Sequence, residues 1–382
     1  MKRTCGSVLF LFMSKQILKG LDREELVAFM ASLNEPPFRA RQLFRWMYGR
    51  AAQNFEEISD FAKPLRARLQ EAATLETLAL ETRQISQRRD AEKFLFRLAD
   101  GAHIESVLMH EGGGGRPARH TLCISSQVGC PVDCKFCATG LMGLVRNLRP
   151  GEMVDQVLQA KRLSGSKALA GSPITNVVVM GMGEPMLNYD ALMKACYLLG
   201  DAEGPHLAPR RIVISTSGLV PKIERFTTDG HKFRLAISLN ATTDEVRNEI
   251  MPINRKYPIA ALLQAARNYT RQAKLRVTFE YILLDGINDS LADAERLKIL
   301  TRNIPCKINL IPYNPIAEAH QSASGLEALL AYRRPSFERI EAFLTCMRAG
   351  SNTVTLRWSK GDDIDAACGQ LWTKVEKKML LV

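Results

Sequence analysis

From residue 119 onward, the chain repeats one pattern of apolar and polar positions. Short apolar stretches typical of buried strands alternate with longer stretches, such as residues 151–163 and 259–270, whose apolar positions recur at helical spacing. The predicted strands are residues 120–125, 174–180, 211–215, 234–239, 277–284 and 307–311. These six units are fewer than the eight of a closed barrel, so we predict an α/β fold with a (β/α)6 partial barrel.

The N-terminal segment, residues 21–75, reads as helical. Asp22 caps a helix over residues 23–33, and the pair Pro36 and Pro37 ends it. Residues 38–48 then place aromatic side chains at helical spacing with arginines on the opposite side. This second helix either contacts a phosphate backbone through its arginines, such as Arg41 and Arg45, or packs its aromatic stripe into a local core.

Residues 76–110 have strand character. Two apolar stretches, residues 93–98 and 104–109, flank a turn at Asp100 and Gly101, which predicts a β-hairpin. The four glycines at 112–115 are expected to form a flexible link. The expected domains are a helical accessory module (14–75), the hairpin extension with its link (76–115), the barrel (116–357) and a C-terminal segment (358–382).

Polar residues and glycines gather where the predicted strands end. They lie at 125–127, 181–185, 215–218, 238–240 and 312–315. The carboxyl ends of barrel strands meet at one face, which carries the active site in enzymes of this architecture. Turn formation explains the glycines and prolines, but not a glutamate with several Ser, Thr and Asn residues at the same ends. We therefore predict an enzyme whose site lies at this face.

Three cysteines after the first predicted strand, Cys130, Cys134 and Cys137, have the spacing Cys-x3-Cys-x2-Cys. A 4Fe-4S cluster normally takes four thiolates, so three ligands leave one iron open. Radical S-adenosylmethionine (SAM) enzymes use this spacing, and their open iron binds SAM. A zinc site would need a fourth Cys or His at a partner spacing, which we do not find. Nine cysteines without a secretory signal do not indicate a disulfide scaffold.

The strand-end residues suit such a ligand. Gly183 lets the backbone approach it closely, and the Glu184 carboxylate can receive the ammonium group of SAM. Ser215, Ser238 and Asn314 can bond to ribose hydroxyls or to the SAM carboxylate.

Composition adds constraints on partners. The chain is 46% hydrophobic, and 52 Lys and Arg against 40 Asp and Glu give a net charge of +12. This charge favours a polyanionic partner, although many basic proteins only solvate their surface. The apolar run at 8–13 is too brief to span a bilayer and lacks a cleavage site, so we expect no membrane partner. Translation could begin at Met1 or Met13.

Motifs along most of the chain carry a closer resemblance. They occupy residues 121–130, 134–137, 146–148, 181–185, 215–218, 251–254, 306–312 and 361–371. Together they resemble the RlmN family of radical SAM adenosine C2 methyltransferases, from about residue 21 to residue 371. The motif at 361–371 is the most specific, because ordinary radical SAM enzymes do not end this way.

The resemblance implies cofactors, contacts and partners. It implies a 4Fe-4S cluster on Cys130, Cys134 and Cys137, and two SAM molecules per turnover. The implied SAM contacts are Gly183, Glu184, Ser215, Ser238, Leu239, Asn240 and Asn314. Many members have His where Asn240 stands, and either side chain can bond to SAM. The implied substrates are adenosine in large-subunit ribosomal RNA at the peptidyl transferase centre and in transfer RNA next to the anticodon. An electron donor such as flavodoxin, an RNA-binding N-terminal module, a monomer and a cytoplasmic location are also expected.

Adenine chemistry explains why the family needs two more cysteines. C2 of adenine is electron-poor and carries no nucleophilic lone pair, so it cannot attack the SAM methyl group directly. The resemblance assigns Cys368 as the methyl acceptor, whose methylene radical can add to C2, and Cys123 as the thiol that resolves the adduct. The resemblance assigns the role of proton acceptor to Glu105, with Glu111 as the alternative.

Two other functions stay open from the sequence. Methylation at C8 of the same ribosomal adenosine, an antibiotic-resistance activity, uses the same cysteines. A non-catalytic zinc-containing RNA-binding protein is the alternative from a different class.

Overall fold

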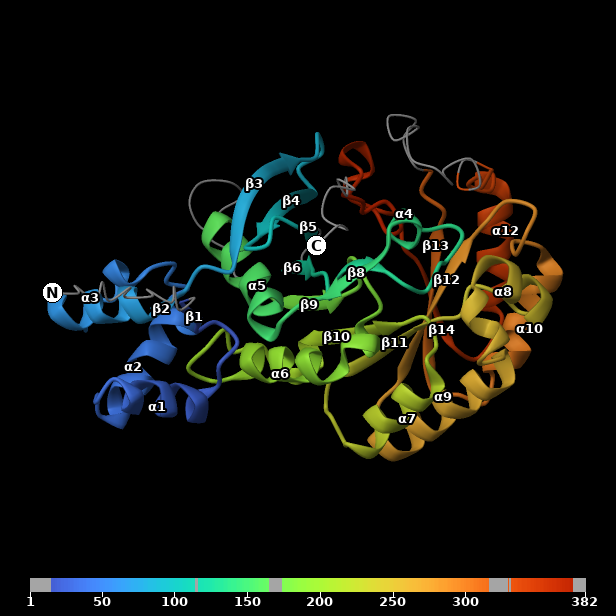
Figure 1. Cartoon of the computed structure of the whole chain (residues 1–382). Helices are drawn as coiled ribbons and strands as arrows, with labels where there is room; N and C mark the ends of the chain where they lie inside the picture. Colours follow the sequence, from blue (N-terminus) through green and yellow to red (C-terminus); the bar gives the residue numbers. More distant parts are fainter. Residues whose placement is uncertain (1–14, 114–115, 165–173, 316–328, 330, 374–382) are drawn as a thin grey trace, which may run out of the picture.

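A large mixed sheet organises the molecule. The computed structural model describes residues 15–113, 116–164, 174–315, 329 and 331–373. Ten strands pair in the order β14-β13-β12-β11-β10-β9-β6-β5-β4-β3, and those from β6 to β14 are parallel (Figure 1). The apolar run at 8–13 lies outside the described residues.

All six predicted barrel strands are confirmed. They are β6 (Arg116–Cys123), β9 (Asn176–Val179), β10 (Ile212–Thr216), β11 (Arg234–Ser238), β12 (Val277–Leu283) and β13 (Cys306–Pro312). A further parallel strand, β14 (Thr353–Leu356), was not predicted; it extends the sheet beyond β13. The fold is therefore a partial α/β barrel, with the parallel strands β6 to β14 in one open sheet.

Helices cover the outer face of the parallel strands (Figure 1). They are α5 (Pro150–Ser164), α6 (Tyr189–Gly200), α7 (Val220–Thr228), α8 (Asp244–Ile250), α9 (Ile259–Ala273), α10 (Leu291–Thr301) and α12 (Phe337–Arg348). Helices α5 and α9 match the two predicted from apolar spacing. Strands buried on both faces need apolar residues throughout, and every residue of β9 is buried.

The predicted hairpin is part of the same sheet. Its strands are β4 (Ala91–Leu98) and β5 (His103–Gly113), and β3 (Leu78–Ile85) pairs with β4 on the other side. Strand β5 also pairs antiparallel with β6, with Val107 opposite Cys123. Within the expected link at 112–115, Gly112 and Gly113 belong to strand β5, and Gly113 pairs with Arg116 of β6. Residues 114 and 115 lie outside the described residues.

The N-terminal module is mainly helical. It contains β1 (Gln16–Ile17), α1 (Arg23–Ser32), α2 (Pro37–Phe44), a π-helical turn (Arg45–Gly49), a 3-10 turn (Phe55–Glu57), α3 (Lys63–Ala72) and β2 (Ala73–Thr74). Asp22 caps α1 as predicted, in a capping box with Glu25. The predicted helix over 38–48 is confirmed, except that it changes to π-helical geometry at Arg45.

Aromatic side chains of this helix pack into a core. Phe44 and Tyr48 are buried, with ring centroids 4.6 Å apart, and the Tyr48 hydroxyl donates to the Leu21 carbonyl. On the outside, Arg41 makes an ion pair of 2.7 Å with Glu203, which follows α6. The aromatic side chains of this helix therefore pack into a local core, which was the second of the two alternatives. Arg41 forms an ion pair with Glu203 of the barrel.

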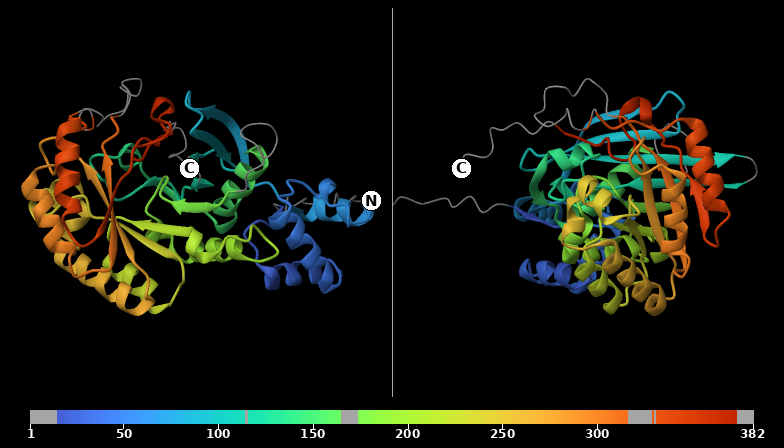
Figure 2. Two further views of the ribbon diagram at one scale, coloured as in Figure 1. Left: turned by 180° about the vertical axis from the view of Figure 1, so that it is seen from behind. Right: turned by 90° about the vertical axis from the view of Figure 1, so that its right-hand side faces the viewer.

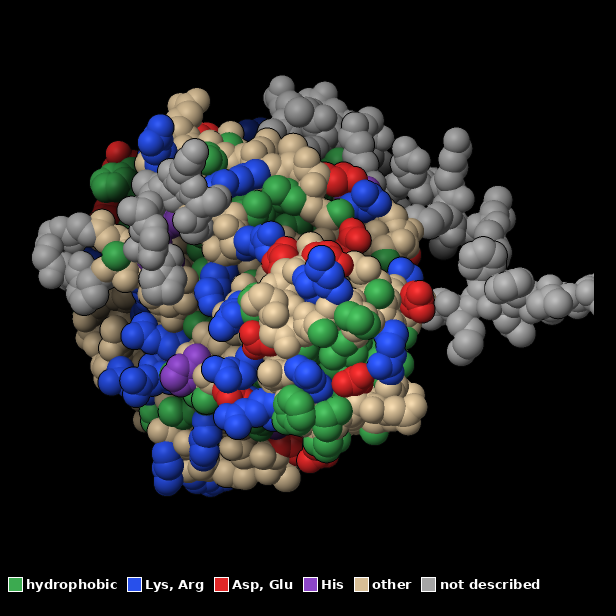
Figure 3. Space-filling model, turned by 90° about the vertical axis from the view of Figure 1, so that its left-hand side faces the viewer, with side chains coloured by type: hydrophobic (Ala, Val, Ile, Leu, Met, Phe, Trp, Pro, Cys, Tyr) green, Lys and Arg blue, Asp and Glu red, His purple; other side chains and the backbone are tan. Residues whose placement is uncertain are grey.

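The module lies at one end of the sheet, beside α5 and α6 (Figure 2). A fully buried ion pair joins the N-terminal module to the barrel: Lys19 Nζ lies 2.6 Å from the Asp155 carboxylate of α5. Lys and Arg side chains gather on the face of the molecule that carries this module (Figure 3). Within the described part of the chain, no helix is long and apolar enough to cross a membrane.

Candidate active site

A short hairpin holds the cysteine loop over the carboxyl ends of the strands. Strand β7 (Gln127–Cys130) pairs with β8 (Gly143–Asn147), and the loop between them contains the short helix α4 (Ala138–Leu141). Gly129 is required here, since it has φ of +72° and a Cβ would lie 1.9 Å from the Gly143 carbonyl oxygen. The loop is anchored by hydrogen bonds from Lys135 N to Ile250 O and from Ala138 N to Gly369 O.

The three loop cysteines border one cavity. Cys130, Cys134 and Cys137 line a space of about 840 Å³, counting its part open to solvent. Burial raises the pKa of the Cys130 thiol to about 12 and also raises the pKa values of Cys134 and Cys137. These thiols are therefore neutral on their own and would lose protons on binding a metal.

Three cysteines are the ligand set of a 4Fe-4S cluster with one open iron. Across the described ranges, no group of three or more His, Cys, Asp or Glu side chains is placed to hold a metal ion. Each thiolate of a 4Fe-4S cube binds a different iron, so cluster ligands need not converge on a point. Three cysteines around an open cavity match that requirement.

Most of the predicted SAM contacts line the same cavity. Gly183, Glu184, Ser215, Ser238 and Asn240 border it together with the cysteines. They come from the carboxyl ends of β9, β10 and β11, as predicted for a barrel enzyme. Leu239 and Asn314 are not among the lining residues: Leu239 is buried beside the cavity, and the Asn314 amide donates to the Cys368 carbonyl over 3.3 Å.

The turn at Gly183 depends on a close backbone approach. Gly183 has φ of +102°, and a Cβ there would lie 2.5 Å from the Cβ of Gln127. The Gln127 side chain accepts a hydrogen bond of 2.8 Å from Glu184 N. The glycine therefore joins the β9 turn to the cysteine hairpin.

Glu184 is a buried carboxyl group with a fixed orientation. Burial raises its pKa, and the Ser217 backbone N–H, which donates to Oε2 over 2.7 Å, acts in the opposite direction. Met186 N donates to the other oxygen over 3.0 Å. These two bonds fix the orientation of the carboxyl group, and no cation in the described part of the chain pairs with it.

A second buried carboxyl group in this cavity has an unsatisfied oxygen. Glu280 accepts from Asn309 through Oε1 over 2.9 Å, while its buried Oε2 has no hydrogen-bond partner among the described residues. Buried polar atoms are rarely left unpaired. The cavity therefore fits a polar, cationic ligand such as SAM. Sequence reasoning missed Glu280, which lies within β12 rather than at its end.

The side chain of Asn240 forms its hydrogen bonds with other protein groups. Its side-chain oxygen accepts from Ile282 N over 2.9 Å, its side-chain nitrogen donates to Met251 Sδ, and its backbone carbonyl accepts from Asn288. Its φ of +56° lies in the left-handed region that Asn tolerates better than most residues. This geometry gives Asn240 a turn-forming role at the cavity edge.

Arg247 of α8 was also missed by sequence reasoning. It is fully buried and donates to the Leu239, Ser217 and Ser238 carbonyls and to the Asn254 side chain. Burial lowers its pKa to about 10. The guanidinium thus ties the ends of β10 and β11 together. Helical periodicity does not predict it, because an arginine on a short polar helix normally faces solvent.

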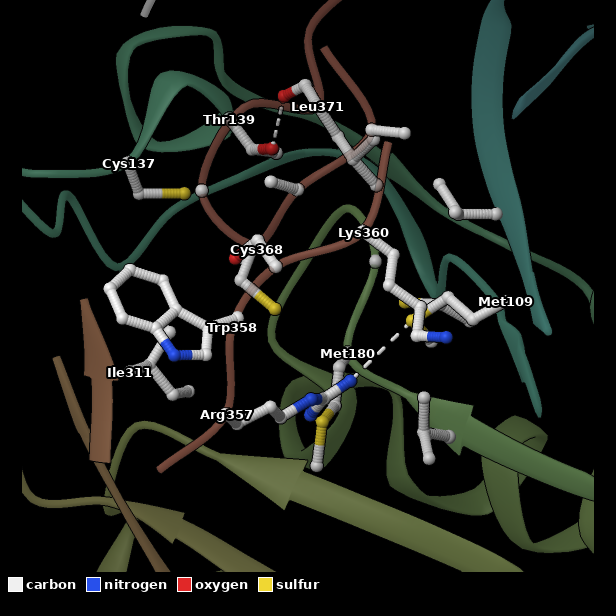
Figure 4. Close-up of a pocket in the computed structure, with 18 of the residues that line it drawn as sticks. Met109, Cys137, Thr139, Met180, Ile311, Arg357, Trp358, Lys360, Cys368 and Leu371 are labelled. Atoms are coloured by element: carbon white, nitrogen blue, oxygen red, sulfur yellow. Dashed lines mark hydrogen bonds between the residues drawn. The ribbon is translucent and has the colours of Figure 1, made fainter. Parts of the chain in front are cut away.

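Cys368 lines both the cavity of the three loop cysteines, which we call the cluster cavity, and a second cavity of about 740 Å³, counting its part open to solvent. Figure 4 shows the residues of this second cavity. Cys123 lines the second cavity with Cys368, and both are free thiols. We call this space the thiol pocket; Met109, Arg357, Trp358 and Lys360 also line it. Burial raises the pKa of Cys123 to about 12. The structure therefore brings together the two cysteines that the sequence placed far apart.

The two candidate bases occupy different places. Glu105 is buried, pairs with Lys93 Nζ at 3.1 Å and accepts from Trp372 N over 2.9 Å. Burial raises its pKa, which the Lys93 charge opposes. Glu105 is not among the residues that line the thiol pocket, whereas the more exposed Glu111 is.

Arg357, immediately after β14, lines both cavities. Burial alone would lower its pKa, but the nearby Cys368 thiol and Glu280 carboxyl group raise it overall. A guanidinium between the two cavities therefore supplies positive charge beside both thiols. It was missed because the strand that places it was not predicted.

Comparisons with known proteins agree with this geometry. The sequence model of the radical SAM superfamily matches residues 124–297, and that of the "Ribosomal RNA large subunit methyltransferase N-terminal domain" matches residues 17–75. A radical SAM methyltransferase from Sphaerobacter thermophilus has a similar structure, with a TM-score of 0.85 and 44% identity over 93% of this chain and 99% of that one. The fold and site therefore define a radical SAM enzyme.

Curated relatives narrow the class to a family. "Dual-specificity RNA methyltransferase RlmN" of Anaeromyxobacter sp. (strain Fw109-5) is 47% identical over 93% of this chain and 90% of the relative. The protein of the same name from Geobacter sulfurreducens is 45% identical over 94% of this chain and 92% of the relative. The chain belongs to the RlmN family, and it is an enzyme that methylates RNA.

Proposed function

We propose that this enzyme methylates C2 of adenosine in large-subunit ribosomal RNA and in transfer RNA next to the anticodon. The observation that carries the proposal is the position of Cys368, which borders both the cluster cavity and the pocket that contains Cys123. A methyl group held on Cys368 would lie between the site where a radical is generated and the thiol needed for release.

The cofactors fit the residues around the first cavity. Cys130, Cys134 and Cys137 would hold a 4Fe-4S cluster, and Glu184, Ser215 and Ser238 would hold SAM at its open iron. When bound, the cluster and SAM together supply a 5′-deoxyadenosyl radical. Two SAM molecules are needed per turnover, one as methyl donor and one as radical source.

Cys368 carries the methyl group to the base. Its thiolate would accept the methyl of one SAM, with S-adenosylhomocysteine as the leaving group. The S-methyl group would then give one hydrogen atom to the 5′-deoxyadenosyl radical, which forms 5′-deoxyadenosine and leaves a carbon radical on Cys368. This radical adds to C2 of adenine, where ionic methylation has no nucleophile to use. The product of this step is RNA covalently joined to Cys368.

Release needs a base and a second thiolate. The base takes the proton from C2; we keep Glu105 in this role, with Glu111 as the alternative because it lines the thiol pocket. The Cys123 thiolate then attacks the sulfur of Cys368, the carbon–sulfur bond breaks, and the released carbon takes a proton to become the methyl group. The unpaired electron of the adduct would return to the cluster that Cys130, Cys134 and Cys137 hold, so that a disulfide and the methylated base remain. For Glu105 to act, the backbone contact from Trp372 must first give way.

The remaining assignments extend the same proposal. The N-terminal module (14–75) would contact RNA, an electron donor such as flavodoxin would reduce the enzyme, and the protein would act as a cytoplasmic monomer. The expected units 76–115, 116–357 and 358–382 would then carry the hairpin extension, the barrel chemistry and the methyl-accepting cysteine.

A nucleoside analysis tests the position of methylation. Purified, anaerobically reconstituted enzyme would act on a transcript of the peptidyl transferase region and on a transfer RNA transcript. Digested RNA would then be compared with C2- and C8-methyladenosine standards by mass spectrometry. We expect C2-methyladenosine; C8-methyladenosine alone would replace the proposal with the resistance activity.

A further inference from the structure

Two large aromatic side chains lie in solvent beside the thiol pocket. Trp358 is 46% exposed and Phe337 is 61% exposed, and their rings stack with centroids 6.5 Å apart and an interplanar angle of 12°. Trp358 follows β14 and Phe337 begins α12, so two separate elements build the pair. Clustered exposed aromatics indicate a binding surface more often than a single exposed apolar residue does.

The position of the pair relates it to the reaction. Trp358 lines the thiol pocket with Cys123 and Cys368, and its ring lies beside Cys368 and Ile311 (Figure 4). An RNA base that reaches these thiols must leave its stack and pass the mouth of this pocket, since a stacked base does not expose its ring atoms. Leaving the stack costs a few kcal/mol.

Among the described residues, two cations lack a carboxylate partner: Arg334, near the Trp358 ring, and Lys360, which lines the thiol pocket. The Arg334 guanidinium lies 6.0 Å from the Trp358 ring centroid and donates to the Tyr313 carbonyl and to Asn314. Lys360 lines the pocket and donates to the His110 carbonyl. Among the described residues, neither forms an ion pair with Asp or Glu. Aromatic rings combined with free cations are the pattern by which proteins bind single-stranded nucleic acid.

We propose that Trp358 and Phe337 form a stacking platform for an unpaired RNA base next to the target adenosine, with Arg334 and Lys360 facing its phosphates. This inference rests on the proposed RNA substrate and makes it more specific: the enzyme binds a target whose neighbouring nucleotide is also unstacked. The stacking would offset part of the cost of extracting the target base. An adenosine inside a continuous duplex would then be a poor substrate.

The main test compares RNA affinity of Trp358→Ala and Trp358→Phe with that of the wild type. The probe is a transcript of the peptidyl transferase region. Where methylation is measured as well, sodium dithionite is the reductant, so that no protein electron donor takes part. Base stacking contributes about 1–3 kcal/mol, so Trp358→Ala should weaken binding by about 5- to 150-fold. Trp358→Phe should recover most of the affinity because it keeps an aromatic ring.

Three controls separate stacking from folding and chemistry. The circular dichroism spectrum and the iron content of the reconstituted Trp358 variants should match those of the wild type, since neither measurement depends on the pocket's chemistry. Tyr197→Ala, which removes another exposed aromatic from the outer helix α6, should leave RNA affinity unchanged. Fluorescence of Trp358, in a variant with Trp46 and Trp372 replaced by Phe, should be quenched when the transcript binds.

Specific results would overturn the platform. Wild-type affinity in Trp358→Ala would do so, as would a Trp358→Phe variant as weak as Trp358→Ala. If the Trp358 variants methylate RNA normally with dithionite but poorly with flavodoxin, the surface binds the electron donor instead of RNA. If wild-type enzyme binds the transcript but makes no C2-methyladenosine, the proposed function is wrong. The affinities of the Trp358 variants would still show whether Trp358 stacks on an RNA base.

Discussion

At the scale of single residues, the two cysteines of the thiol pocket have separable tasks. Cys368 borders both cavities, whereas Cys123 lines only the thiol pocket. A methyl acceptor must reach the radical source, but a resolving thiol needs only to reach the sulfur of Cys368. The structure thus gives each cysteine the neighbours that its proposed step requires.

The variants of these cysteines should fail at different steps. Cys368→Ala should carry no S-methylcysteine and form no RNA adduct, since the acceptor is gone. Cys123→Ala should accept the methyl and add to RNA but be unable to release it. It should therefore accumulate RNA joined to Cys368, visible as a nuclease-sensitive, slowly migrating band on a denaturing gel. Free methyladenosine at wild-type yield from Cys123→Ala would return Cys123 to a purely structural role.

The buried state of Cys123 predicts how release depends on pH. Burial raises its pKa to about 12, so the thiol is neutral at pH 7 and its thiolate fraction rises about tenfold for each pH unit up to pH 9. If thiolate attack limits release, decay of the RNA adduct in single-turnover experiments should accelerate by a similar factor. Decay that is equally fast at pH 7 and pH 9 would show that RNA binding has already lowered the pKa of Cys123 or that another step is limiting.

At this scale, the sequence predicted site residues that lie close together along the chain. The spacing of Cys130, Cys134 and Cys137 fixes all three on one short loop, so their common cavity could be predicted. Arg247 and Glu280 could not be, because their burial depends on neighbours that are distant in sequence. The same holds for Glu105, whose contact with Trp372 joins residues 267 positions apart.

At the scale of elements, the strand ends determine the site. Alternation of apolar stretches predicted β6 and β9–β13 because parallel strands buried on both faces are continuously apolar. Strand β14 escaped prediction, since only four residues form it and they are partly exposed. Its absence from the prediction also hid Arg357 and Trp358, which it places at the thiol pocket.

The second helix of the N-terminal module offers an element-scale test. Arg41 and Arg23 both pair with Glu203, and hydrogen bonds from Arg41 and then Arg23 lower the pKa of Glu203 to about 2. The pairing therefore persists at neutral pH and is lost only as the pH falls from the ordinary range of a glutamate toward 2. Exposed pairs of this kind contribute little stability individually, because solvent screens the two charges.

We expect Arg41→Glu to weaken RNA binding by loosening the module, since it places two carboxylates together. The charge-exchanged double variant Arg41→Glu with Glu203→Arg should restore binding if Arg41 acts through this contact. Filter binding at several salt concentrations would measure both. If the double variant binds as weakly as Arg41→Glu alone, Arg41 instead contacts phosphate directly, and the salt dependence should be shallower than in the wild type.

At the scale of the whole molecule, the sheet joins the parts that the sequence analysis treated separately. Strands β3 to β5 continue from the barrel, so Glu105, Glu111 and Cys123 lie on one continuous surface with the site. The C-terminal segment crosses over this surface: Trp372 N bonds to Glu105, and the Leu371 carbonyl accepts from Thr139. Motif resemblance identified these regions, but only the folded chain shows that one segment contacts both the hairpin extension and the cysteine loop.

The central claim is that the transferred carbon passes through Cys368. Enzyme loaded with a deuterated methyl group on Cys368, then freed of SAM, would receive unlabelled SAM and the ribosomal transcript for one turnover. One deuterium should move to deoxyadenosine, and the C2-methyladenosine should retain two, because a methylene group is transferred and then gains one hydrogen. Unlabelled methyladenosine, with the deuterated methyl still on Cys368, would contradict the account.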